Sequence, residues 1–142
     1  MRKVSDILQK KNRPPITVSV DSPVIEALRI MAENDIGSVV VTQHGKYAGI
    51  ITERDYSRKV ILQGKSSSDT KVADIMTTDL QKLSPTDTVE RCSELMSAKH
   101  VRYLPVFDNE NFVGIISMTD VVQATLHNQR EMIMHLQSYL NS

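Results

Sequence analysis

Short apolar runs alternate with amphipathic stretches along the first half of the chain. Residues 16–20, 38–42 and 47–51 are rich in apolar and β-branched side chains, which favours strands. Residues 24–31 carry apolar side chains at three- and four-residue spacing, which predicts a helix with one buried face. A second helix is predicted over about residues 54–62. The pattern therefore indicates an α+β unit in the order β-α-β-β-α.

The second half of the chain repeats this order of elements. Strands are predicted over residues 80–83, 103–107 and 112–116, with one helix starting near residue 89 and another near residue 119. A repeat this short cannot close a core alone, so the two copies are expected to pack through their sheets with approximate two-fold symmetry. The long connection inside each copy predicts one parallel strand pair.

A short opening precedes each copy. Residues 3–8 (Lys-Val-Ser-Asp-Ile-Leu) and residues 71–76 (Lys-Val-Ala-Asp-Ile-Met) each predict a helical turn. The serine-rich stretch after Gly64 predicts a flexible joint between the copies. The predicted organisation is a first repeat at residues 1–65, a linker at 66–70, a second repeat at 71–127 and a helical extension at 128–142.

Three single residues predict a helix cap, the position of a strand and a buried thiol. Ser22 supplies a capping hydroxyl for the helix that Pro23 opens. Pro105 removes a backbone donor, so its strand is expected at a sheet edge or at an irregular strand start. Cys92 lies on the apolar stripe of its helix and is expected to be an unreactive, packed thiol.

Charge and cysteine content argue against several classes of protein. Lys and Arg total 17 and Asp and Glu total 17, so no net field attracts nucleic acid or an anionic membrane. Cys92 is the only cysteine, which excludes an internal disulfide, and no Cys/His cluster has zinc spacing. No apolar run has the length of a signal peptide or a membrane span. We expect a soluble, cytoplasmic protein.

Each copy carries one motif that joins a strand to a helix. The first motif reads Gly49-Ile-Ile-Thr52-Glu-Arg54-Asp55, and the second, 65 residues later, reads Gly114-Ile-Ile-Ser117-Met-Thr119-Asp120. A hydroxyl and a carboxylate at a helix start lie beside unpaired backbone N–H groups, which can hold an anion. The pair of motifs therefore predicts two nucleotide sites. The simpler alternative is a capping box, which has the same spacing.

With these motifs the sequence resembles a tandem pair of cystathionine-β-synthase (CBS) domains, also called a Bateman module. The resemblance rests on the two openings, on residues 36–41 and 101–106, and on both Gly-x-x-[Ser/Thr]-x-x-Asp motifs, and it covers about residues 3–127. It implies a regulatory protein, not an enzyme, that binds AMP, ADP or ATP, or alternatively NAD or S-adenosylmethionine. The implied partners are this nucleotide, a second copy in a homodimer and an unidentified protein target.

The resemblance also implies how the ligand is held. The motif Asp accepts hydrogen bonds from ribose hydroxyls, the nearby hydroxyl faces the phosphates, and adenine lies against strands of the opposite copy. Site A would comprise Thr52, Arg54 and Asp55 with Thr77, Leu80, Val101 and Arg102. Site B would comprise Ser117, Thr119 and Asp120 with Ile16, Ile36 and Gly37.

The two implied sites differ in charge. Arg54 and Arg102 can hold phosphate through planar guanidinium groups, so site A is favoured for a charged nucleotide. The alternative for Arg54 is a solvated helix charge, and the alternative for Arg102 is a pair with a surface carboxylate. Site B has Met118 and Thr119 at the matching motif positions, so its cation must come from elsewhere. Candidates for that cation are Lys10, Lys11 and Arg13.

Other roles are open for parts of the chain. The second hypothesis is a ligand-independent interaction module, and a hydrolase or transferase is disfavoured because no activated nucleophile can be assigned. The last predicted helix either covers its own core or forms a dimer contact, although its apolar spacing is imperfect for a coiled coil. Its apolar side chains include Leu126, Met132, Ile133, Leu136 and Leu140.

Overall fold

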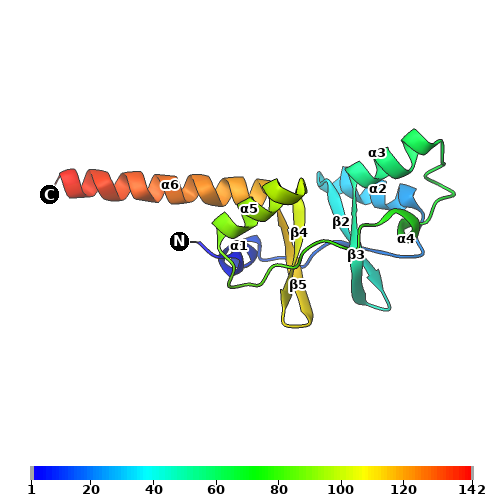
Figure 1. The fold of residues 1–142 in the computed structure, drawn as a ribbon, viewed down its shortest axis with the longest axis horizontal. Coiled ribbons are helices and arrows are strands. Elements are labelled where there is room, and N and C mark those ends of the chain that lie inside the picture. Colours follow the sequence, from blue (N-terminus) through cyan, green and yellow to red (C-terminus); the bar gives the residue numbers. More distant parts are fainter. Residues whose placement is uncertain (1, 142) are drawn as a thin grey trace. The chain divides into compact units, whose positions relative to one another are not determined.

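The computed structural model describes residues 2–141 and forms two compact units (Figure 1). Unit 1 contains the residues up to Arg13 together with those from Gln81 onward, and unit 2 contains Pro14–Leu80. Both units mix helices with strands, which confirms the predicted α+β class and the repeated order of elements.

Unit 2 is built on a three-stranded sheet in the order β1-β2-β3. β1 runs parallel to β2 and β2 runs antiparallel to β3, which confirms the predicted parallel pair. α2 supplies Val24, Ala27 and Met31 to the core beneath the sheet. The elements are β1 (Thr17–Ser19), α2 (Val24–Asn34), β2 (Ser38–Gln43), β3 (Lys46–Thr52), α3 (Glu53–Lys59), the 3-10 helix η1 (Ile61–Gln63) and α4 (Val72–Ile75).

Unit 1 has an antiparallel pair of strands, β4 and β5, packed with three helices. Cys92 and Met96 of one helix pack against Leu104 and Ile116 of the strands, as their apolar spacing predicts. The elements are α1 (Val4–Lys11), α5 (Val89–Lys99), β4 (Tyr103–Asp108), β5 (Asn111–Ser117) and α6 (Met118–Leu140).

The strand predicted over residues 80–83 is wrong except at Leu83, which forms a single parallel bridge with Val106. In unit 2, the Val40 N–H donates to the Ile16 carbonyl over 3.2 Å. Pro105 stands 65 residues after Val40 and has no N–H to donate. The ladder in unit 1 therefore lacks the hydrogen bond that would extend a strand backward from Leu83.

The start of α2 also differs from the prediction. Its N-cap is Pro23, and no side chain, that of Ser22 included, caps the helix. The N–H of Val24 instead donates to the Thr70 carbonyl over 2.8 Å, and that of Ile25 donates to Ser67 over 3.0 Å. The serine-rich stretch is thus hydrogen-bonded to the start of α2 and is not a free joint.

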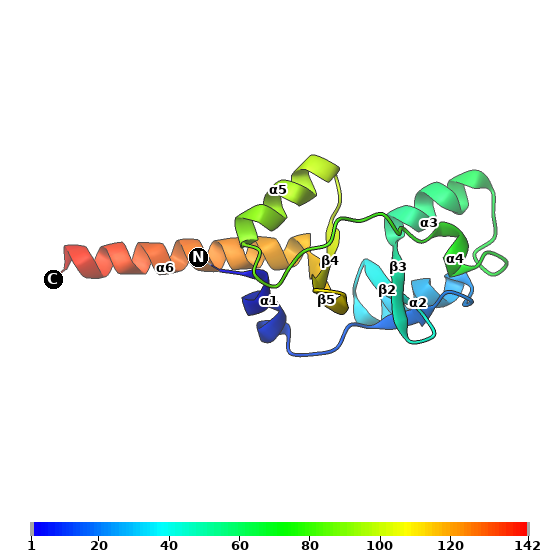
Figure 2. The same ribbon diagram turned by 60° about the horizontal axis from the view of Figure 1, so that its bottom comes forward.

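The opening helix of each sequence repeat packs against the body of the other repeat. α1 lies beside β5 in unit 1, and α4 lies beside α3 in unit 2 (Figures 1 and 2). Val4 and Ile7 of α1 belong to the core of unit 1, whereas Val72 and Ile75 of α4 belong to that of unit 2. Each compact unit therefore combines the body of one sequence repeat with the opening of the other.

The two motif glycines make room for these exchanged segments. A Cβ atom on Gly49 would lie 2.7 Å from the Thr77 carbonyl oxygen, and one on Gly114 would lie 2.7 Å from the Leu8 side chain. The backbones of Ile50 and Thr77 hydrogen-bond to each other in both directions, over 3.0 and 2.8 Å. The close approach explains why glycine begins both motifs.

Candidate functional site

Both motifs form the capping box that their spacing also predicted. α3 follows Thr52, whose hydroxyl oxygen accepts from the Asp55 N–H over 3.1 Å. α6 follows Ser117, whose hydroxyl oxygen accepts from the Asp120 N–H over 3.1 Å. Each aspartate in turn accepts from the backbone N–H of its capping residue. The capping role is thus present in both motifs.

The first N–H of each of these helices is also satisfied. The Glu53 N–H donates to the Gly37 carbonyl over 3.1 Å, and the Met118 N–H donates to the Arg102 carbonyl over 2.8 Å. The third N–H of each helix bonds the capping hydroxyl. The prediction of unpaired N–H groups is therefore wrong for the first and third positions of each helix. An anion at either motif must be held mainly by side chains.

The carboxylate of Asp55 is enclosed by its own unit. One oxygen accepts from the backbone and the hydroxyl of Thr52 over 3.0 and 3.1 Å. The other accepts from the Thr77 hydroxyl and the Lys59 ammonium, each over 2.9 Å. Asp55 is only 6% exposed. Both oxygens therefore have protein partners, and a ligand hydroxyl would have to replace one of them.

The carboxylate of Asp120 is less enclosed. Its Oδ2 accepts from the Ser117 N–H over 2.8 Å and from the Lys11 ammonium over 2.9 Å. Lys11 also donates to the Ile115 carbonyl over 3.1 Å, which fixes the ammonium beside the motif. Among the described residues, Oδ1 of Asp120 has no hydrogen-bond partner. This oxygen remains available as an acceptor.

Asp120 lines a pocket of about 360 Å³ within unit 1. This volume falls within the range of small-molecule sites, which is about 300–1,000 Å³. The wall contains four basic side chains and one acidic side chain, so the pocket favours an anion. The Arg2 Nε is buried there and has no hydrogen-bond partner in the described part of the chain. The lining residues are Arg2, Ile7, Lys10, Lys11, Arg13, Asp120, Gln123, Ala124 and His127.

A single difference on the motif helices contributes to this contrast. Lys59 reaches Asp55 in unit 2, and the residue 65 positions later in unit 1 is Ala124. The methyl side chain of Ala124 cannot reach Asp120 and instead forms part of the pocket wall. The cation beside Asp120 comes from Lys11, in the exchanged opening segment.

Among the residues predicted for site A, the structure brings Thr52, Asp55 and Thr77 into direct contact. Arg54 and Leu80 belong to the same unit and are half-buried. Val101 and Arg102 belong to unit 1, so their pairing with Asp55 stays a prediction.

Among the residues predicted for site B, Ser117 and Asp120 are in contact, whereas Thr119 is exposed. The residues predicted to complete this site, Ile16, Ile36 and Gly37, belong to unit 2. Their pairing with Asp120 stays a prediction.

The sequence-based interpretation missed several pocket residues. Gln123, Ala124 and His127 follow Asp120 by three, four and seven residues, the spacing of one helix face, and this spacing could have revealed them. Arg2 gave no such signal. Lys59 follows Asp55 by four residues and was also missed.

Cys92 is fully buried, and burial raises the pKa of its thiol to about 11, with a smaller contribution from Asp87. The thiol therefore stays protonated at neutral pH. Across residues 2–141, no three His, Cys, Asp or Glu side chains are grouped closely enough to hold a metal ion. No helix in that range has the length and apolar character of a membrane span.

The chain belongs to the CBS domain family, whose model matches residues 4–61 and 72–127. It is 37% identical over 146 residues to the CBS domain-containing protein CBSX3, mitochondrial, of Arabidopsis thaliana, covering 96% of this chain and 71% of that relative. A protein with CBS domains from Burkholderia ambifaria is similar with a TM-score of 0.85 and 37% identity, covering 90% of this chain and 96% of that one.

A second similar structure contains ligands. The CBS domain pair of protein MJ0100 was solved in complex with 5′-methylthioadenosine and S-adenosyl-L-methionine. It has a TM-score of 0.77 and 28% identity, and the match covers 90% of this chain and 98% of that one.

Proposed function

We propose that the protein is a regulatory protein that binds an adenosine nucleotide, with the pocket beside Asp120 as its principal ligand site. The observation that carries this proposal is that Asp120 lines a pocket with four basic side chains and has one carboxylate oxygen without a hydrogen-bond partner in the described part of the chain. A ribose hydroxyl can donate to that oxygen. The surrounding ammonium and guanidinium groups can hold a phosphate.

This proposal reverses the preference for site A that the sequence alone favours. At Asp55, every carboxylate oxygen already has a protein donor. A ribose hydroxyl there must displace Thr77 or Lys59. A displaced Thr77 hydroxyl needs a new partner, whereas the Lys59 ammonium keeps its bond to the Ile75 carbonyl. We therefore assign Asp55 mainly a structural role, with weaker ligand binding.

The charge of the pocket narrows the class of ligand. AMP, ADP and ATP carry phosphates that four basic side chains attract, whereas the sulfonium group of S-adenosylmethionine is repelled by them. The complexes of MJ0100 support recognition of an adenosine group by a related fold. NAD also carries phosphates and remains an alternative ligand.

The proposed output is a change of partner or of oligomer. A ligand shifts such an equilibrium only if it binds one arrangement more tightly than the other. The regulated protein and the cytoplasmic location stay predictions, and the Arabidopsis relative is named as mitochondrial.

Isothermal titration calorimetry tests the site. AMP is titrated into the wild type, Asp120→Asn and Asp55→Asn, with adenosine as the ligand that lacks phosphate. We expect Asp120→Asn to weaken AMP binding at least about 10-fold, or about 1.4 kcal/mol, and Asp55→Asn to have a smaller effect. Lys10→Gln combined with Arg13→Gln should weaken AMP binding more than adenosine binding. Unchanged AMP affinity in Asp120→Asn would exclude this pocket.

The ligand-independent interaction module makes the opposite prediction. Ligand at 100 times its dissociation constant should add about 2.7 kcal/mol to the free energy of unfolding. If none of AMP, ADP, ATP, NAD and S-adenosylmethionine raises the unfolding temperature, the second hypothesis is favoured.

A further inference from the structure

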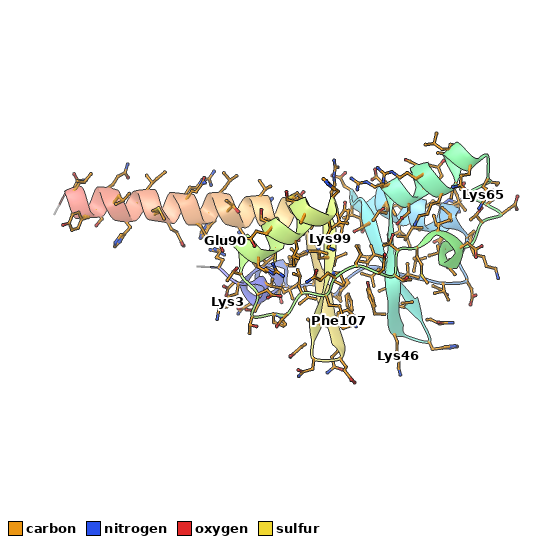
Figure 3. All side chains as sticks on the ribbon, in the orientation of Figure 1. Lys3, Lys46, Lys65, Glu90, Lys99 and Phe107 are labelled. Atoms are coloured by element: carbon orange, nitrogen blue, oxygen red, sulfur yellow. The ribbon has the colours of Figure 1, made fainter. Side chains whose placement is uncertain are left out.

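The second half of α6 lies apart from the other elements of unit 1. Only Val121 and Ala124 of this 23-residue helix are buried. Residues 129–140 are all exposed, and in both ribbon views this part extends away from α1, α5 and the β4–β5 pair (Figures 1 and 2). Side chains project from it in several directions (Figure 3), and Glu131 lies 3.9 Å from Arg2, near the start of the chain.

Most of the exposed large apolar side chains of the described chain lie on α6. They are between 47% and 79% exposed. A helix with a wide apolar stripe normally buries that stripe against another element. An isolated helix shorter than about 12–15 residues is also only marginally stable in water. The side chains on α6 are Val122, Leu126, Met132, Ile133, Met134, Leu136, Tyr139 and Leu140.

Six positions on this face follow a heptad pattern. Successive members are separated alternately by four and three residues, which is the spacing of the seam of a coiled coil. The sequence-based interpretation judged the spacing imperfect from a set that included neither Val122, which is exposed, nor Gln129. Met132 and Tyr139 lie directly beside the seam. The seam consists of Val122, Leu126, Gln129, Ile133, Leu136 and Leu140.

We propose that α6 pairs with α6 of a second copy of the chain in a parallel two-stranded coiled coil through this seam. The pairing uses neither Asp55 nor Asp120 and is independent of the proposed ligand site.

The apolar area matches what a stable dimer buries. A Val, Leu, Ile or Met side chain carries on the order of 100 Å² of apolar surface. Without Met134, which lies off the seam, the seven exposed apolar side chains in or beside the seam therefore offer on the order of 400 Å² per copy. A standard protein interface buries about 800 Å² per partner, of which roughly 450 Å² is apolar. The apolar stripe is thus comparable in area with the apolar part of a standard interface with a second copy.

Gln129 and Arg130 favour the parallel orientation. In a parallel pair, Gln129 faces Gln129 of the second copy, and each amide can donate to and accept from the other. In the antiparallel pair with matched apolar layers, Gln129 would face Ile133 and lose this partner. That arrangement also brings the two Arg130 side chains together, whereas the parallel arrangement places Arg130 across from Thr125. A polar residue at one seam position commonly fixes register and orientation.

Sedimentation equilibrium of the whole chain tests the interface, with Ile133→Asp as the seam variant and Met134→Asp as the control. Both residues are exposed neighbours on α6, at 55% and 67%, but only Ile133 lies in the seam. We expect a wild-type dimer whose dissociation constant rises about 100-fold or more in Ile133→Asp. Met134→Asp should change it by less than about threefold. Far-UV circular dichroism checks that unit 1 stays folded.

The proposal is overturned if the wild type is still monomeric at about 100 µM protein, because the dissociation constant of the dimer would then lie above that concentration. A dimer that both substitutions affect equally, or that neither affects, also overturns it.

Oxidative cross-linking tests the orientation. Leu136→Cys should form a disulfide between the two copies, because a parallel seam places equal positions opposite each other. Met134→Cys is the control and should remain reduced. Cys92 does not interfere, since it is buried and protonated at neutral pH. If chains with Leu126→Cys cross-link to chains with Leu136→Cys and neither cross-links to itself, the parallel orientation is wrong.

Discussion

In unit 2 the Asp55 carboxylate is bonded through both oxygens, and the residue is 6% exposed. In unit 1, Asp120 lines a pocket of about 360 Å³, and its Oδ1 has no hydrogen-bond partner among the described residues. The two aspartates occupy the same motif position and cap their helices in the same way. The motif therefore determines the cap, and its surroundings determine whether a ligand can reach the carboxylate.

The residues that surround each motif aspartate belong to two segments, the motif helix and the exchanged opening. On the motif helix, Lys59 of unit 2 corresponds to Ala124 of unit 1. In the exchanged openings, unit 2 receives the neutral hydroxyl of Thr77, whereas unit 1 receives Lys11 together with Lys10 and Arg13. The exchange thus gives the two units unlike charges near equivalent carboxylates.

The largest expected difference between the units concerns the motif glycines. Gly49→Ala would place a methyl group 2.7 Å from a backbone oxygen that is hydrogen-bonded to Ile50, so the backbone must move. Gly114→Ala meets only the end of the Leu8 side chain, which can rotate. We expect losses of about 3 kcal/mol and about 1 kcal/mol in the free energy of unfolding. Urea titration measures both, and equal losses would contradict the assigned contacts.

The second largest expected difference is in how much the two motif aspartates contribute to the free energy of unfolding. Asp55→Ala removes a helix cap and leaves the Thr77 hydroxyl without its acceptor. Lys59 loses its ion pair but keeps the Ile75 carbonyl and is partly exposed to water. We expect a loss of about 2 kcal/mol. Asp120→Ala removes the cap in a more open setting and should cost about 1 kcal/mol. The free energies of unfolding from guanidinium titration provide the comparison. A larger cost at Asp120 would contradict the greater enclosure of Asp55.

Much of the fold could be predicted because its signals are local. The strands after residues 37 and 102 follow from β-branched runs, and the capping boxes follow from the three-residue spacing of Thr52 and Asp55 or of Ser117 and Asp120. The exchange of the opening helices could not be predicted, because residues 3–8 and 71–76 have nearly the same sequence and fit either body equally well.

The candidate site was less predictable, because it also depends on contacts between distant parts of the chain. The sequence identifies the motif carboxylates, but it does not show which of their oxygens are already bonded. Whether Asp120 is open depends on Ala124 and on Lys11, whose contact with Asp120 spans 109 residues. Arg2 enters the pocket wall from a segment without any recognisable pattern.

Transferring the Lys59 side chain into unit 1 should close its pocket. In Ala124→Lys, the new ammonium can reach Asp120 as Lys59 reaches Asp55, and it occupies the space assigned to the nucleotide. We expect AMP binding to weaken about 10-fold or more, about 1.4 kcal/mol. Thr125→Lys is the matched control, since it adds the same charge at an exposed neighbouring position. If both variants lose the same AMP affinity, the added charge alone explains the loss, and the prediction that Lys at position 124 closes the pocket is wrong.

The smallest expected effect concerns the missing strand of unit 1. Pro105→Val gives unit 1 the residue that unit 2 has at position 40, and its N–H can donate to the Gln81 carbonyl as Val40 donates to Ile16. The new hydrogen bond contributes about 1 kcal/mol, but the loss of proline makes the unfolded chain more flexible by about 0.5 kcal/mol. The net gain should be about 0.5 kcal/mol, so amide hydrogen exchange is the sharper measurement. Slow exchange of the residue 105 amide would show that the ladder has extended. An amide that exchanges as fast as one in an open loop would mean that something other than Pro105 keeps the strand short.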